Sequence, residues 1–380
     1  MKPLEGLLVL EFCQYMAGPS AGLRLADLGA RVIKIERPIV GEGSRQLAIK
    51  NLFVDESSLV FHTINRNKES FAANLKDPED LKSIKTLLKV ADIMTHNFRP
   101  GVMEKIGLDY ETVSAINPKL VYGVVSGYGN TGPWAKKPGQ DLLVQSLSGL
   151  SYLSGSANDH PTPMGLAACD MLTGMHLTQG LLAALIRRGK TNTGGLVEVS
   201  LLESTLDFQF EVLTTHYNDG GKYPKRAKEG NAHAYLSAPY GIYKTKNGYI
   251  SMAMTPLTTL VPLLNLELPE AYKSTESWFE KRDDIMDILR SIFITKDTEA
   301  WLTILEAADV WCSNVYTYKD ILEHDAYKVL RMDQLIKNSD GQVIRTTRCP
   351  IRIDDERYYN EKAAPKVGED TDKIIKEFNL

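Results

Sequence analysis

Two aspartates stand where helical patterns begin, and each could do carboxylate chemistry. Asp170 lies just ahead of an apolar helical pattern, and Asp141 opens another in Gly139-Gln-Asp-Leu-Leu-Val. For Asp170 we expect the helix dipole and free backbone amides to hold the carboxylate ionised. An ionised carboxylate in a mostly apolar pocket can attack an activated acyl group and form a covalent intermediate. Each aspartate could instead be only a helix cap, and the residues alone leave both interpretations open.

A second group of residues could bind phosphates. Its members are basic and lie in loops that follow predicted strands, where open α/β sheets bind ligands. They are Arg37, Arg45, Lys76, Arg99, Lys105, Lys136 and Lys137. The alternative is that they are solvated surface charges. The first such loop leads into Ala17-Gly18-Pro19 and not Gly-x-Gly-x-x-Gly, and no Walker sequence is present, which disfavours a nicotinamide enzyme.

Other residue types give little support to metal or hydrolase chemistry. The cysteines (Cys13, Cys169, Cys312 and Cys349) lack the paired spacing of zinc or redox sites, so we expect reduced thiols of a cytosolic protein. The seven histidines include no pair at metal-binding spacing, and no serine lies in a Gly-x-Ser-x-Gly elbow. We therefore predict no metal site.

Alternating strands and helices must position these residues. Leu7–Phe12 and Arg31–Glu36 read as buried strands around a helix at Ala17–Leu28. Further strands are predicted at Ser70–Leu75, Asp92–Asn97, Leu120–Ser126 and Val197–Ser200, and helices at Asp80–Val90 and Tyr110–Ile116. This alternation predicts an α/β fold with a large Rossmann-like, doubly wound domain over about the first 200 residues.

The middle of the chain predicts a long helix and then a smaller α+β domain. From Asp170 to about Arg188 the pattern is apolar nearly all round, which is typical of a buried helix. An amphipathic helix at Leu202–His216 and a linker at Asn218–Gly230 are expected next. The stretch 238–253 then reads as a hairpin that turns at Asn247-Gly248.

Composition excludes several classes of protein. The chain has 380 residues, is 43% hydrophobic and carries a formal charge of −4, which suits an ordinary globular protein of two or three domains. Slight acidity argues against nucleic acid as the main partner. No apolar run approaches the length of a membrane span, and the first eleven residues are too acidic for a signal peptide, so we expect a cytoplasmic protein with no membrane partner.

Several motifs in order carry a family resemblance. They are Pro3–Phe12 followed by Ala17-Gly-Pro19, Leu28-Gly-Ala-Arg-Val-Ile-Lys-Ile-Glu-Arg37, Asn65-Arg-Asn-Lys68, Asn97-Phe-Arg-Pro-Gly101, Gly127-Tyr-Gly-Asn-Thr-Gly-Pro133 and Ala364–Asp372. They run almost end to end, and with them the chain resembles the class III coenzyme A transferases, the formyl-CoA transferase and CaiB/BaiF type of acyl-CoA transferase.

The resemblance implies a mechanism and a set of binding residues. Asp170-Met-Leu-Thr-Gly-Met-His-Leu177 matches the context of the family's nucleophilic aspartate, which forms a mixed anhydride and then an aspartyl-CoA thioester. Gln140 and Asp141 fall at the same catalytic centre, with the Gln140 amide and the loop Gly230–His233 as plausible oxyanion donors. The residues implied to contact CoA are Gln14, Tyr15, Met16, Ala17, Arg37, Ala73, Lys76, Asn97, Phe98, Arg99, Lys105 and Lys137.

The resemblance also implies the assembly and the partners. It suggests an interlocked homodimer, with a large domain at 1–217 and 319–380, a linker at 218–230 and a small domain at 231–318. The partners would be acyl-CoA and small carboxylic acids, and no tightly bound cofactor is expected.

Three alternatives remain. An α-methylacyl-CoA racemase of the same superfamily would have a histidine at Gln140 and a glutamate near Thr255-Pro256, and this chain has neither. A non-catalytic CoA-binding protein and a dehydrogenase-like enzyme are the others. Met16 and Leu47 replace the glutamine and tryptophan of the formyl-CoA enzyme, and this favours an acid larger or more apolar than oxalate. Asp309–Val315 replaces the family's late Gly-x-Pro loop.

Overall fold

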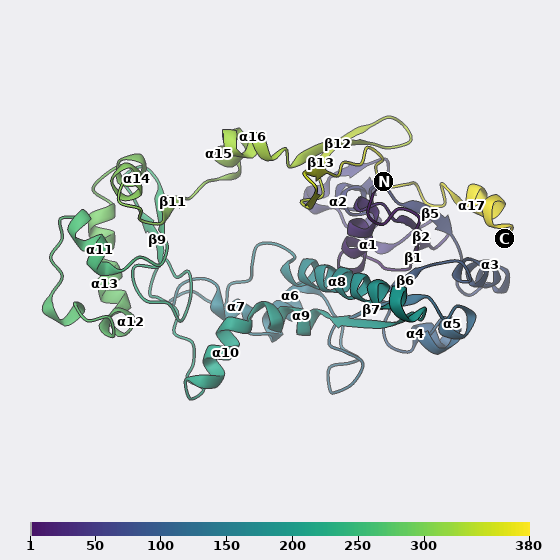
Figure 1. Ribbon diagram of the computed structural model, residues 1–380, viewed down its shortest axis with the longest axis horizontal. Helices are drawn as coiled ribbons and strands as arrows, with labels where there is room; N and C mark the ends of the chain where they lie inside the picture. Colours follow the sequence, from purple (N-terminus) through teal and green to yellow (C-terminus); the bar gives the residue numbers. More distant parts are fainter. Residues whose placement is uncertain (1) are drawn as a thin grey trace. The chain divides into compact units, whose positions relative to one another are not determined.

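The computed structural model of the chain describes residues 2–380 and divides into two compact units, which we describe separately. The first unit contains residues up to 144, residues 167–208 and residues 329–380; the second contains residues 145–166 and 209–328 (Figure 1). These boundaries differ from the expected ones, since 145–166, 209–217 and 319–328 group with the second unit.

The first unit is built on a six-stranded sheet with the order β5-β2-β1-β6-β7-β8. The strands are β1 (Leu8–Glu11), β2 (Arg31–Glu36), β5 (Glu69–Ala72), β6 (Ile93–His96), β7 (Val121–Ser126) and β8 (Gly195–Ser200). Every pair in the sheet is parallel. Numbered along the chain, the order is 3-2-1-4-5-6, the doubly wound arrangement. The predicted parallel sheet is confirmed.

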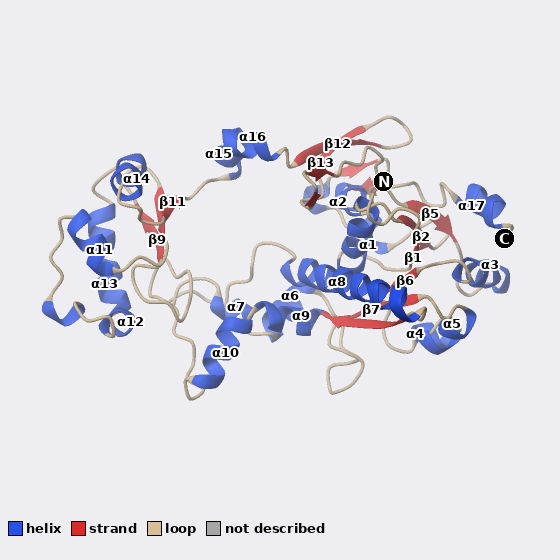
Figure 2. Cartoon of the chain, viewed as in Figure 1, coloured by secondary structure: helices blue, strands red, loops and turns tan. Residues whose placement is uncertain are grey.

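Helices cover both faces of this sheet because its strands are apolar on both sides (Figure 2). Leu8 and Leu10 face a core that includes residues of α3 (Pro78–Leu88), α4 (Val102–Lys105), α5 (Tyr110–Ile116) and α17 (Thr371–Phe378). Val9, between them, faces the core formed with α1 (Ala17–Asp27), α8 (Ala168–Thr191) and α9 (Leu201–Phe208).

The long helix α8 packs closely on α1. A Cβ added to Gly174 would lie 2.7 Å from the Ala17 carbonyl oxygen, and one added to Gly180 would lie 2.6 Å from Val197, so both positions need glycine. The helix begins two residues earlier than predicted and is not buried all round. Its outer face leaves Ile186 65% exposed, which corrects the expectation of a buried helix.

The predicted helix at Leu202–His216 is two helices. α9 ends at Phe208, Gln209 leaves helical geometry at φ −96° and ψ 16°, and α10 (Phe210–Asn218) follows in the second unit. The sequence pattern ran through this break because amphipathic residues continue on both sides of Gln209.

The second unit has a three-stranded antiparallel sheet packed on helices. Its strands are β9 (Gly241–Lys244), β10 (Tyr249–Met252) and β11 (Cys312–Asn314), and the predicted hairpin turn lies between the first two. Its other elements are α7 (Leu150–Leu153), α11 (Leu257–Leu263), η3 (Glu270–Tyr272), α12 (Ser277–Glu280), α13 (Arg282–Phe293), α14 (Thr298–Glu306) and α15 (Tyr318–Glu323). Residues 218–230 do not form a free linker, since Ala227 is buried in this core and Arg282 donates a hydrogen bond to the Lys225 carbonyl.

Shorter elements complete the chain. They are α2 (Leu59–Ile64), the 3-10 turns η1 (Gly43–Arg45) and η2 (Ile49–Asn51), α6 (Asp141–Leu147), α16 (Asp325–Leu330) and the pairs β3 (Phe53–Val54) with β4 (Ser57–Ser58), β12 (Asp333–Lys337) with β13 (Val343–Thr347), and β14 (Arg352–Ile353) with β15 (Glu356–Arg357). The returning C-terminal segment covers the outer edge of β5, where Asp370 and Thr371 side chains accept the N–H groups of Ser70 and Ala72. Over residues 2–380, no helix is both long and apolar enough to cross a bilayer.

Candidate active site

Asp170 and Asp141 meet at the start of α8. Asp170 is the third residue of this helix, and its backbone N–H donates a 3.0 Å hydrogen bond to Oδ2 of Asp141. The residue before the helix, Ala167, provides no side-chain cap. The Asp141 carboxylate therefore caps α8, while the Asp170 side chain lies in its first turn.

The environment of Asp170 does not hold it strongly ionised, contrary to the expectation from helix position. Burial, followed by repulsion from the Asp141 carboxylate, raises the pKa of Asp170 to about 7. Removal from water disfavours a charged carboxylate more than the helix terminus favours it. A carboxyl group with a pKa near neutrality is a common sign of a functional site.

Two close backbone approaches bring these aspartates to the carboxyl edge of the sheet. Gly174, one helical turn beyond Asp170, rests against Ala17, so the start of α8 lies beside the start of α1. A Cβ built on Gly139 would lie 2.5 Å from the Gly127 Cα, so the segment ahead of Asp141 lies against the backbone just after β7. Both aspartates thus stand near the loops that follow β1 and β7.

The loops after β1 and β6 are joined at the point where the strand order reverses. The Gln14 N–H donates to the Asn97 side-chain oxygen at 2.8 Å, and the Asn97 amide nitrogen donates to the Gln14 carbonyl at 2.7 Å. Ligands of open α/β sheets bind at this switch point. The structure thus brings Asn97, which lies in a separate sequence motif, next to the predicted site residues Gln14, Tyr15, Met16 and Ala17.

Tyr15 adopts a left-handed backbone conformation, with φ at 63°, that residues other than glycine usually avoid. Its N–H donates a 3.1 Å hydrogen bond to the carboxylate of Glu42, and its ring lies where a Cβ on Gly43 would stand. Glu42 is itself buried. This carboxylate was not among the predicted site residues, because nothing in the sequence around Glu42 distinguishes it from a surface charge.

A buried charge cluster lies beneath the same loop. Lys68 is 0% exposed and donates to both carboxylate oxygens of Glu11 at 2.9 Å and to the Pro19 carbonyl, while Lys34 donates to Glu11 and to the Cys13 carbonyl. The lysines thereby fix the backbone on both sides of residues 14–17. In the sequence, the only sign of this cluster was the Asn65–Lys68 motif. The structure shows that Lys68 of this motif holds the loop from below.

On the other loop, His96 and Phe98 are arranged by burial. Burial lowers the pKa of His96 to about 4, so the ring is neutral near pH 7, and its Nδ1 accepts the Phe98 N–H. The two rings stack with centroids 6.2 Å apart. Phe98 is consequently held at the edge of the sheet beside the Gln14–Asn97 pair.

The predicted phosphate-binding group divides in two. Arg45 is 3% exposed, and its guanidinium donates hydrogen bonds to Glu36, Ser57 and the Pro365 carbonyl. It is therefore a structural residue and not a cation available to a ligand. Among residues 2–380, no ion pair involves the exposed members Arg37, Lys76, Arg99, Lys105, Lys136 and Lys137. Lys137 lies 5.3 Å from the centre of the Trp134 ring. Of the remaining predicted residues, Gln140 is exposed, and Ala73 is buried with its N–H bonded to Glu36.

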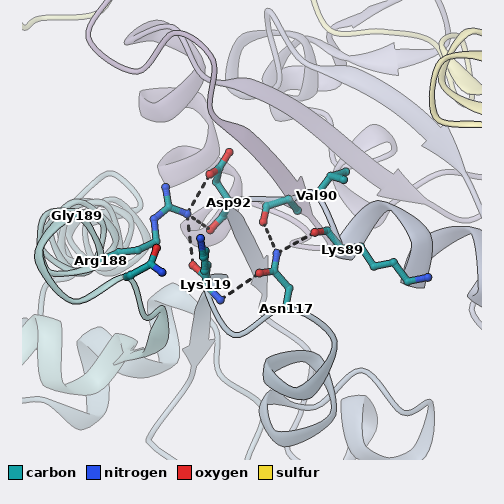
Figure 3. A pocket seen from close by; sticks show the side chains of 9 residues that line it. Lys89, Val90, Asp92, Asn117, Lys119, Arg188 and Gly189 are labelled. Atoms are coloured by element: carbon teal, nitrogen blue, oxygen red, sulfur yellow. Dashed lines mark hydrogen bonds and ion pairs between the residues drawn. The ribbon is translucent and has the colours of Figure 1, made fainter.

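A cavity of about 420 Å³ lies at the opposite, amino edge of the sheet (Figure 3). There Arg188 pairs with Asp92 at 3.0 Å, and Asn117 donates to the carbonyls of Leu88 and Ala91. These polar groups hold helix ends to strand starts. Neither Asp141 nor Asp170 lines this cavity, so it is not the candidate site.

Metal chemistry receives no support from the described side chains. Across residues 2–380 no group of three or more histidines, cysteines, aspartates or glutamates could hold an ion.

Comparison with known proteins gives a consistent result. The model of the family described as CoA-transferase family III matches residues 4–371. Over 99% of its length the chain is 32% identical to human succinyl-CoA:glutarate CoA-transferase, covering 86% of that protein, and 31% identical to succinate–glutarate CoA-transferase of Agrobacterium fabrum, covering 95%.

Solved structures agree with this comparison. The fold matches a CAIB/BAIF family protein from Brucella suis with a TM-score of 0.83 at 29% identity, covering 99% of both chains. The hypothetical protein Rv3272 of Mycobacterium tuberculosis matches with a TM-score of 0.84 at 26% identity, covering 98% of this chain and 99% of the other. The chain is therefore a member of CoA-transferase family III.

Proposed function

We propose that this protein moves CoA from an acyl-CoA thioester to a free carboxylic acid, with Asp170 as the nucleophile. One observation carries the proposal: Asp170 is a carboxyl group with a raised pKa, held by Asp141 at the carboxyl edge of a doubly wound sheet. With a pKa of about 7, part of the population is ionised near neutral pH and able to attack.

The chemistry proceeds in two exchanges. Asp170 attacks the donor carbonyl, the C–S bond breaks, and the products are a mixed anhydride and CoA thiolate. The thiolate attacks the aspartyl carbonyl, the donor's acid leaves, and an aspartyl-CoA thioester remains. The acceptor acid then repeats both steps in reverse. The Gln140 backbone amide is the proposed donor to the oxyanions.

CoA is proposed to bind across the switch point. The loop at Gln14–Ala17 and the residues Asn97 and Phe98 would receive its adenine and pantetheine, since this is where such sheets bind ligands. The phosphates would meet the exposed cations Arg37, Lys76, Arg99, Lys105 and Lys137. Ala73 is proposed to line the same site after β5. No tightly bound cofactor is needed for these steps.

Short dicarboxylic acids are the first substrates to test. The relatives above are named for succinyl-CoA, succinate and glutarate, and an acetyl-CoA:oxalate CoA-transferase of Acetobacter aceti is 37% identical over 64% of this chain. Met16 and Leu47 favour an acid larger than oxalate. We therefore propose succinyl-CoA as donor and glutarate as acceptor, with oxalate as the discriminating alternative.

A homodimer is proposed as the working unit, interlocked as the family resemblance implies. The first unit exposes large apolar side chains between β2 and β4, among them Ile39 at 93% and Ile49 at 67%. Exposed apolar side chains gathered on one segment are typical of an interaction surface. Light scattering coupled to gel filtration will give twice the mass of 42.4 kDa if the proposal holds.

The test of the nucleophile is a trapping experiment. The protein is mixed with succinyl-CoA, quenched with hydroxylamine or borohydride, digested and examined by mass spectrometry. The adduct is expected at Asp170 and absent from Asp170→Ala, which should also lose transfer to glutarate. Asp207→Ala, which removes an exposed carboxylate on α9, should keep both.

Three outcomes would count against the proposal. Transfer that persists in Asp170→Ala would refute the covalent mechanism, and CoA binding without any transfer over a panel of donors and acceptors would favour a non-catalytic protein. Solvent deuterium appearing at the α carbon of a branched acyl-CoA at catalytic rates would favour racemase chemistry.

A further inference from the structure

The hydrogen bond between Asp141 and Asp170 places two carboxylates in one small region. Asp141 is 7% exposed and begins α6, and its Oδ2 accepts the Asp170 N–H at 3.0 Å. A neutral amide or hydroxyl could cap the helix equally well. The choice of a charged cap next to a second carboxylate therefore needs a reason beyond capping.

Two like charges in a partly dry site repel each other when both are ionised. Asp141 on α6 is the charged group that acts on Asp170. Cys169, next to Asp170 on α8, is neutral because burial raises the pKa of that thiol to about 11. The free, ionised form of Asp170 is thus the unfavourable one.

Acylation removes this repulsion. An anhydride or thioester of Asp170 carries no charge, so the repulsive interaction is present in the resting enzyme and absent from both covalent intermediates. In forming the aspartyl thioester, the negative charge passes from Asp170 to CoA thiolate as the C–S bond breaks. It then passes to the donor's carboxylate as the anhydride C–O bond breaks.

Resting on the function proposed above, we propose that Asp141 is a positioning residue whose negative charge destabilises the free Asp170 carboxylate and so favours its acylated forms. Asp141 fixes the backbone at the nucleophile through the N–H hydrogen bond and drives the first exchange through its charge. The effect is relief of ground-state repulsion at the reacting group.

The proposal predicts an equilibrium as well as a rate. A carboxylate more basic than an ordinary acid forms a thioester that is more stable relative to its free form. Each unit by which the pKa of Asp170 is raised favours the equilibrium for CoA transfer onto Asp170 by up to about tenfold. Without the charge of Asp141, the aspartyl thioester should therefore be less populated at equilibrium with donor and free acid.

Asp141→Asn separates charge from hydrogen bonding, because an amide oxygen can still accept the Asp170 N–H. In this variant the Asp170 titration midpoint, followed by ¹³C NMR of carboxyl-labelled aspartate and assigned by comparison with Asp170→Asn, should fall toward the ordinary value. The equilibrium fraction of aspartyl-CoA thioester, measured by quench and mass spectrometry with succinyl-CoA and succinate, should fall by up to about tenfold for each pKa unit that Asp170 loses. Asp141→Ser repeats the test with a second neutral acceptor.

The controls distinguish this inference from the function on which it rests. Asp207→Asn, which removes an exposed carboxylate on α9, should leave the thioester fraction near the wild-type value. If the wild type forms the thioester and the neutral variants match it in both titration and equilibrium, the role of Asp141 is refuted. If the wild type forms no thioester at Asp170, the proposed function itself fails.

Discussion

Removing the carboxylate of Asp170 is expected to stabilise the folded protein above pH 7. The pKa of Asp170 rises from 3.8 to about 7 on folding, so the native state binds this proton more tightly than the unfolded chain does. The stability that comes from the bound proton is complete below pH 3.8 and is lost as pH rises through about 7. Asp170→Asn has no such loss.

The magnitude follows from the shift. About three pKa units at about 1.36 kcal/mol each give a penalty of about 4 kcal/mol above pH 7, of which about 3 kcal/mol develops between pH 5 and pH 8. Solvent screening of a carboxyl group that is not fully buried reduces this to roughly 1–3 kcal/mol. For a chain of 380 residues the Asn variant should therefore gain roughly 1–4 °C in Tm relative to the wild type at pH 8, and much less at pH 5.

Differential scanning calorimetry at both pH values measures this difference. Asp372→Asn on α17 serves as the matched control, since its side chain is exposed and none of the ion pairs among residues 2–380 involves it, so its replacement should change Tm equally at pH 5 and pH 8. A Tm difference between Asp170→Asn and wild type that stays constant from pH 5 to pH 8 would show that the folded site does not disfavour the charged form.

Three further predictions concern the loops that surround the site. Asn97→Ala removes both hydrogen bonds to Gln14, so KM for acyl-CoA should rise about tenfold with kcat nearly unchanged, whereas Asn117→Ala at the opposite edge should lower stability only; equal KM effects would contradict this. Lys68→Met removes one of the two lysines that pair with buried Glu11 and leaves Lys34 as the remaining partner, so it should cost about 1.5–3 kcal/mol in urea unfolding, against less than about 0.5 kcal/mol for the exposed Lys82→Met; similar losses would argue against a buried pair. Cys13, whose pKa burial raises to about 12, should resist iodoacetamide until the protein is unfolded, and alkylation of the native protein would show that the β1 loop opens.

The sheet could be predicted from sequence because its strands are short apolar runs. β2 matches the predicted Arg31–Glu36 residue for residue, and the strands around it follow the alternation that parallel sheets impose. Helix ends were less predictable. The break at Gln209 has no glycine or proline to mark it, and α8 begins at Ala168 where no capping side chain signals a start.

The site was predictable in its nucleophile and switch-point loops but not in its electrostatics. Charged residues are rarely buried, so the sequence gives no reason to place Lys34, Lys68 and Glu42 inside the fold or to remove Arg45 from the surface. The state of Asp170 depended on the balance between burial and a helix terminus. Burial raises the pKa of Asp170 most, and the carboxylate of Asp141, 29 residues away in sequence, raises it further, because only the folded backbone brings the two aspartates together.

The C-terminal segment has a consequence for how the chain reaches this fold. Asp370, 300 residues beyond Ser70, occupies the hydrogen-bonding edge of β5, together with Thr371. Until that segment has been synthesised, β5 presents an open row of N–H and C=O groups to other chains. The nascent protein therefore exposes an unpaired strand edge through most of translation. Chaperones in the cell, or slow dilution during refolding, should reduce aggregation by keeping neighbouring chains apart.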